Sequence, residues 1–153
     1  MEKEYVPTVC VDFDGTICID GFPDFGPPLL GVREALTTLK QAGYKIRIYT
    51  CRINGNMRDH GLLTGQYNSL IDHLAAHNIP FDDIVLPEEG KPLCDFYIDD
   101  KGIRFEGNWP SIVDFVLAKR IDQLEVAKEH FDSGVASGVV KRLVRQHIRQ
   151  NDL

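Results

Sequence analysis

Short runs of apolar and β-branched residues alternate with helical stretches over the first two thirds of the chain, and this alternation constrains the fold most strongly. Strands are predicted at 6–12, 44–50, 83–86 and 95–98, and helices at 32–42 and 64–78. The polar, glycine-bearing segment 51–61 predicts a loop, and 87–92 a turn. The first run is apolar at most positions, which is typical of a strand buried on both faces. The order predicts an α/β fold, a Rossmann-like open parallel sheet with helices on both faces.

A helical tail is expected after this core. An apolar stripe that begins near Trp109 predicts one helix to about Phe131, and residues 139–150 have the pattern of a basic amphipathic helix. The predicted core is therefore 1–118, and 119–153 form a C-terminal helical extension. The extension either packs on the core or joins copies of the chain into a homo-oligomer through its helices.

The composition argues against several classes of protein. A net charge of -6 gives no overall basic surface for nucleic acid, and 43% apolar residues is ordinary for a globular domain. No apolar run is long enough to cross a membrane, and the N-terminus has no secretory signal. The four cysteines are scattered, without the spacing of a disulfide framework or a zinc site. These features favour a cytoplasmic protein with a small-molecule partner and no membrane contact.

Carboxylates and a threonine follow three of the predicted strands. Asp12 and Asp14 come where the first strand ends, Thr50 ends the second, and Asp99-Asp100 end the last. Ligands bind at the carboxyl ends of parallel strands, so we expect these residues to meet at one edge of the sheet. Carboxylates in one pocket repel each other unless a cation intervenes, and Mg²⁺ prefers oxygen ligands. The sequence therefore predicts a magnesium site at this edge.

Three other side chains suit a phosphate group. The hydroxyl of Thr50 can hydrogen-bond to a phosphate oxygen, the guanidinium of Arg52 matches the same anion, and the ammonium of Lys91 neutralises its charge. Phosphoryl transfer also needs an oxygen nucleophile in line and a proton for the leaving group. Asp12 and Asp14 are the candidates for these two roles.

In this order, the motifs resemble those of the haloacid dehalogenase superfamily of phosphohydrolases. The resemblance spans about 6–116 and rests on D-F-D-G-T-I from Asp12, Thr50 in I-R-I-Y-T, Lys91 in G-K-P and Asp99-Asp100 in Y-I-D-D-K. It implies that Asp12 forms an aspartyl-phosphate, while Asp14 is the general acid and base. It also implies that Asp12, the backbone carbonyl of Asp14 and the Asp99-Asp100 pair hold Mg²⁺.

The intervals between these motifs are too short for the cap domain that many members of the superfamily carry. The segment 15–31 is rich in glycine and proline and predicts a flap, with Phe22 and Phe25 as packing residues or substrate contacts. We therefore expect a capless phosphatase of a small phosphorylated metabolite, such as a sugar phosphate or nucleotide. The alternatives are a phosphatase of a polynucleotide or other polymer end, and a non-hydrolytic receiver-like or binding domain. A receiver has its acidic pair at the first strand, whereas this pair follows Lys91.

Overall fold

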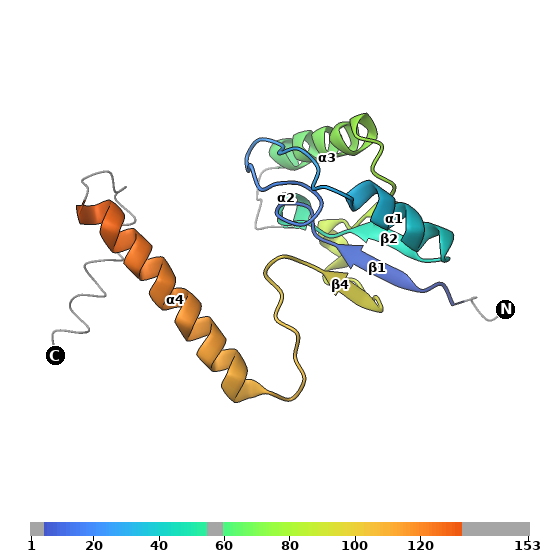
Figure 1. Ribbon diagram of the computed structural model, residues 1–153. Helices are drawn as coiled ribbons and strands as arrows, with labels where there is room; N and C mark the ends of the chain where they lie inside the picture. The colour runs from blue at the N-terminus through green and yellow to red at the C-terminus, as the bar shows by residue number, and fades with distance from the viewer. Residues whose placement is uncertain (1–4, 55–59, 133–153) are drawn as a thin grey trace. The chain divides into compact units, whose positions relative to one another are not determined.

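The computed structural model describes residues 5–54 and 60–132 (Figure 1). The chain divides into two compact units, which are Met1–Gly102 and Ile103–Leu153. The second contains helix α4 (Trp109–Asp132), which agrees with the helix predicted after Trp109. The basic helix predicted at 139–150 lies outside the described residues. Within the described part of the chain, no helix is long and apolar enough to span a membrane.

Four parallel strands form the sheet of the first unit, in the order β3-β2-β1-β4. All four lie within the predicted ranges: β1 (Thr8–Val11), β2 (Lys45–Ile48), β3 (Asp83–Ile84) and β4 (Phe96–Ile98). The last residues of β1, β2 and β4 are paired in register, so the chain leaves these strands at one edge of the sheet. The predicted α/β class with an open parallel sheet is confirmed, and β1 lies between β2 and β4 (Figure 1).

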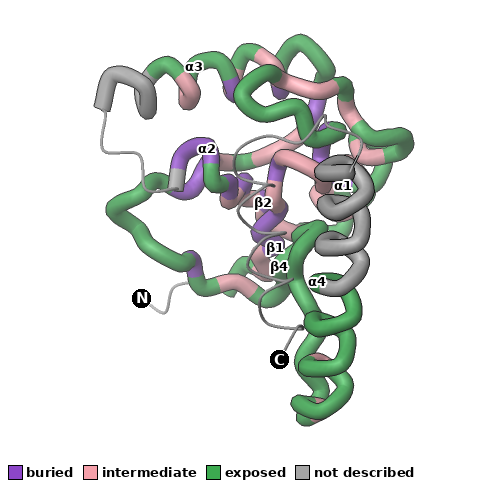
Figure 2. The backbone as a smooth tube through the Cα atoms, turned by 90° about the vertical axis from the view of Figure 1, so that its left-hand side faces the viewer, coloured by how far each residue is buried: buried purple, intermediate pink, exposed green. Residues whose placement is uncertain are grey.

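One face of the sheet carries the main hydrophobic core, and Figure 2 shows buried residues gathered along β1 and β2. Alternate residues of a strand share a face, so every second residue of β1 and β2 points into the core. Helices α1 (Val32–Gln41) and α3 (His60–Ala76) add leucines to the same cluster. The buried members of this core on β1, β2 and the two helices are Val9, Val11, Ile46, Ile48, Leu36, Leu70 and Leu74. The expected helical cover is therefore present on this face.

Arg47 turns to the opposite face, because it lies between the two inward-facing isoleucines of β2. Its guanidinium pairs with Asp83 at 2.6 Å and with Glu89 at 2.7 Å. Glu89 ends the short 3-10 helix η1 (Pro87–Glu89), within the turn predicted at 87–92. The connection between β3 and β4 on this side is thus a turn held by ion pairs.

A short helix, α2 (Cys51–Asn54), follows β2 where the sequence predicts the start of a loop at 51–61. The prediction was wrong there because it relied on polar and glycine content. Ile53 and the side chain of Arg52 are both buried, and the amide of Ile53 donates to the carbonyl of Thr50 at 3.1 Å. Burial of these two side chains stabilises a helical turn too short to show a hydrophobic period.

The predicted flap at 15–31 is an ordered loop without a helix. The amide of Gly15 donates to the carbonyl of Cys18 at 2.8 Å, and that of Ile19 donates to the carbonyl of Pro27 at 2.9 Å. Ile17 and Cys18 are buried in the core. The loop therefore folds back over the end of β1, and the 12–31 interval contains no additional domain.

Candidate active site

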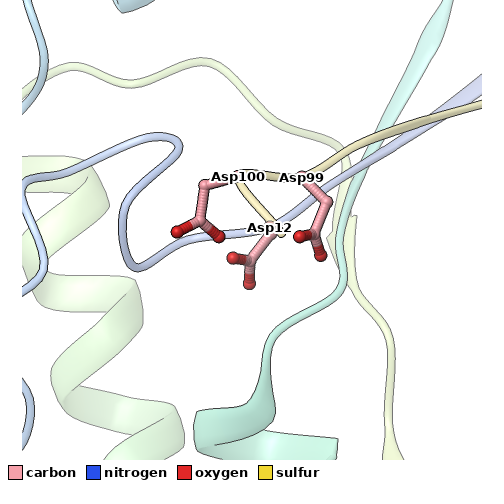
Figure 3. A group of neighbouring side chains, drawn as sticks. All are labelled: Asp12, Asp99 and Asp100. Atoms are coloured by element: carbon pink, nitrogen blue, oxygen red, sulfur yellow. The ribbon is translucent and has the colours of Figure 1, made fainter. Parts of the chain in front are cut away.

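Three carboxylates meet at the carboxyl edge of the sheet. Asp12 follows β1, and Asp99 and Asp100 follow β4, which pairs with β1. The amide of Asp12 donates to the carbonyl of Ile98 at 2.9 Å and fixes the two strand ends together. One oxygen of each carboxylate lies within 4.8 Å of the others, and Figure 3 shows the side chains around a common space. Asp12, Asp99 and Asp100 form the acidic cluster. They lie together at one edge of the sheet, as the sequence predicts.

The acidic cluster is electrostatically unfavourable without a cation. The pKa of Asp12 is raised to about 6, mainly by burial and in addition by the charges of Asp99, Asp100 and Asp14, against the opposing effect of the Phe13 amide. Hard oxygen donors at this spacing match the ligand preference of Mg²⁺. The residues therefore fit a magnesium ion held by Asp12, Asp99 and Asp100.

Lys101 is a cation at the cluster that the sequence reasoning missed. Its ammonium lies 3.7 Å from the carboxylate of Asp100, with the lysine side chain 76% exposed. The charge of Asp100 is the main cause that raises the pKa of Lys101, and Asp12 adds to it. A lysine directly after the acidic pair in Y-I-D-D-K was the available signal. An exposed lysine at this distance leaves the cluster open to a metal ion.

Gly15 allows the start of the flap to pass closely beside the cluster. Its φ is +83°, and a Cβ at this position would lie 2.5 Å from an oxygen of Asp100. The hydroxyl of Thr16 accepts a hydrogen bond from the amide of Asp100 at 3.1 Å. The glycine in D-x-D-G-T is thus needed both for its left-handed backbone and for its lack of a side chain.

The carboxylate of Asp14 is not part of the acidic cluster, since it pairs with Arg52. Nε of Arg52 donates to one oxygen at 2.7 Å, and Nη2 donates to the other at 2.6 Å. The side chain of Arg52 is fully buried and that of Asp14 is 16% exposed. The carboxylate of Asp14 is therefore not among the metal ligands that the structure brings together, and its backbone carbonyl stays a predicted ligand.

The three predicted phosphate ligands lie in different surroundings. Thr50 is buried after β2, and its hydroxyl accepts a hydrogen bond from the amide of Arg52 at 3.2 Å. The ammonium of Lys91 lies 4.8 Å from the centre of the Tyr97 ring. The guanidinium of Arg52 pairs with the carboxylate of Asp14. Thr50 and Lys91 stay predicted phosphate ligands.

Comparison with known proteins found no matching family model and no matching curated protein. Three solved structures are similar in part. A conserved protein from Bacteroides thetaiotaomicron is 24% identical, with a TM-score of 0.46 over 75% of this chain and 93% of that chain. A structural-genomics target from Vibrio cholerae is 33% identical, with a TM-score of 0.41 over 64% and 83%.

The third is a D,D-heptose bisphosphate phosphatase from B. bronchiseptica, whose structure contains magnesium and phosphate. It is 21% identical, with a TM-score of 0.38 over 76% of this chain and 64% of that chain. TM-scores below 0.5 describe only partial likeness.

Proposed function

We propose that this protein is a magnesium-dependent phosphomonoester hydrolase that uses Asp12 as its nucleophile. The observation that carries the proposal is the acidic cluster at the carboxyl edge of the sheet, with Asp14 two residues beyond Asp12. The raised pKa of Asp12, caused mainly by burial and in addition by the neighbouring carboxylates, supports a bound cation here. The motif order of the haloacid dehalogenase superfamily supports the same assignment.

The residues provide a role for each part of the reaction. An oxygen of Asp12 forms a bond to phosphorus, the bond to the leaving oxygen breaks, and Asp14 provides the proton that an alkoxide leaving group needs. In the second half, water attacks the aspartyl-phosphate, its proton goes to Asp14, and Asp12 is released. Thr50 and Lys91 are the proposed ligands of the phosphoryl oxygens. Mg²⁺, held by Asp12, Asp99 and Asp100, would neutralise negative charge on the phosphoryl group.

The proposed substrate is a small phosphorylated metabolite, such as a sugar phosphate or a nucleotide. The net charge of -6 disfavours a long polyanion. The flap is short, and Phe22, which is 59% exposed on it, offers an apolar contact to a ligand. Turnover of a panel of phosphorylated metabolites, ranked by kcat/KM, would identify the preferred class.

The test of the function is turnover of p-nitrophenyl phosphate with and without Mg²⁺. The native chain should be active only with the metal, and Asp12→Asn should lose at least about a hundredfold in kcat, because the nucleophile is lost. Asp72→Asn is the matched control, since Asp72 is an exposed carboxylate on α3. Equal activity of the native chain and Asp12→Asn would overturn the proposal.

A further inference from the structure

The guanidinium of Arg52 uses all five of its N–H groups on the protein itself. Two donate to the carboxylate of Asp14. Nη1 donates to the carbonyl of Pro23 at 2.9 Å and makes a longer contact of 3.4 Å with the side-chain oxygen of Gln66. Nη2 also donates to the carbonyl of Asp24 at 2.6 Å. Arginine has five such donors, so none remains for a phosphate oxygen in this arrangement.

Aromatic rings of the site enclose the same guanidinium. Its central carbon lies 4.2 Å from the centre of the Phe25 ring, 5.1 Å from that of Phe22 and 5.5 Å from that of Phe13. Phe22 and Phe25 belong to the flap, and Phe13 lies between the two aspartates of the motif. The rings keep water from the guanidinium, which strengthens its pairing with Asp14. Arg52 thus links α2, the flap and Asp14.

We propose that Arg52 is a positioning residue for the hydrolysis of the aspartyl-phosphate, a role that rests on the function proposed above. A carboxylate has about four lone-pair sites. Arg52 occupies one lone-pair site on each oxygen of Asp14. The two hydrogen bonds therefore fix the orientation of the carboxylate, and the remaining sites can accept a water proton. In this step the water oxygen bonds to phosphorus, the bond from phosphorus to Asp12 breaks, and the water proton passes to Asp14.

The role predicts an effect on one half of the reaction. Transfer from an aryl phosphate releases a stable phenolate that needs no proton, so this half does not depend on the orientation of Asp14. Release of phosphate from Asp12 does depend on it. Loss of Arg52 should therefore make the second half rate-limiting and cause the phosphoenzyme to accumulate.

The experiment is pre-steady-state turnover of p-nitrophenyl phosphate with Mg²⁺, combined with acid quenching and mass spectrometry of the peptide that contains Asp12. Arg52→Gln should release about one equivalent of nitrophenol in a burst, then turn over on the order of a hundredfold more slowly than the native chain. Arg52→Lys keeps the positive charge but lacks the paired N–H donors of a guanidinium, so its steady-state turnover should lie between those of the native chain and Arg52→Gln. Arg47→Gln is the matched control, because Arg47 is also an ion-paired arginine, bound to Asp83 and Glu89, but lies on the opposite face of the sheet.

A double variant separates positioning from a general loss of structure. Arg52→Gln combined with Asp14→Asn should be no slower than Asp14→Asn alone, since Arg52 acts only through the base that Asp14→Asn already removes. If Arg52→Gln does not fold, the positioning role is tested with Arg52→Lys, alone and combined with Asp14→Asn. Normal turnover in Arg52→Lys, a slow variant without accumulated phosphoenzyme, or a raised KM with unchanged kcat would each overturn the role. An inactive native chain would instead overturn the proposed function.

Discussion

The metal-free protein should lose stability against urea as the pH rises from about 4 to about 7 because of Asp12. Burial is the main cause that raises the pKa of this carboxyl from 3.8 to about 6 in the folded protein, and Asp99 and Asp100 add to it. Below the lower value the group is protonated in both states and has no effect. Between the two values only the unfolded chain has released the proton, so a rise in pH favours unfolding. Above the folded-state pKa, Asp12 is ionised in both states, and the loss of folding free energy stays at its full size.

The size of the effect follows from the two pKa values. Each pKa unit is worth about 1.4 kcal/mol, so the ionised Asp12 should cost the folded protein at most about 3 kcal/mol, and solvent screening of the partly exposed group lowers this value. The assay is urea unfolding followed by circular dichroism in EDTA at both ends of this pH range. All other carboxyl groups titrate in Asp12→Asn as well, so the difference between the two proteins isolates Asp12. The variant should be the more stable of the two at pH of about 7, by about 1–3 kcal/mol.

Magnesium should cancel this loss in the native chain and have little effect on Asp12→Asn, because a bound cation favours the ionised carboxylate. Asp72→Asn should follow the native chain throughout, since Asp72 lies on the exposed side of α3. The reasoning would be refuted by the same pH dependence in the native chain and in Asp12→Asn.

Three further changes test the site and the core. Asp99→Asn should weaken Mg²⁺ binding by roughly tenfold or more in calorimetric titration, because it removes one of the three carboxylates. Gly15→Ala should cost about 1–3 kcal/mol in urea unfolding and raise the Mg²⁺ requirement, since its Cβ would meet Asp100, whereas Gly65→Ala has open space and should do neither. Leu74→Ala should cost about 2–5 kcal/mol without changing kcat per folded molecule, because Leu74 is fully buried in the core.

The strands and long helices could be predicted because their apolar residues recur with a regular period. Burial of Val9 and Val11 on one face of β1 is a direct result of that period, as is the position of Leu36 in α1. The convergence of Asp12 with Asp99 also followed from sequence, since parallel strands end at one edge. These features depend on local pattern and on the topology of parallel sheets alone.

The role of Arg52 could not be predicted in the same way. Its type and its place after Thr50 suggest a phosphate ligand, whereas its five acceptors come from Asp14, from two carbonyls of the flap and from Gln66. Backbone carbonyls leave no signature in a sequence, and the fold of a glycine- and proline-rich loop decides where they point. Helix α2 could not be predicted either, because a single turn is too short to show a hydrophobic period.

Acid-quenched single turnover tests the assignment of Asp12 as nucleophile most directly. Asp14→Asn, which should release phosphate slowly, is mixed with p-nitrophenyl phosphate and Mg²⁺, quenched, digested and analysed by mass spectrometry. The peptide that contains Asp12 should carry one phosphoryl group, and fragmentation should place it on Asp12. Nitrophenol release in the absence of any phosphorylated peptide, or a phosphoryl group on another residue, would contradict the assignment.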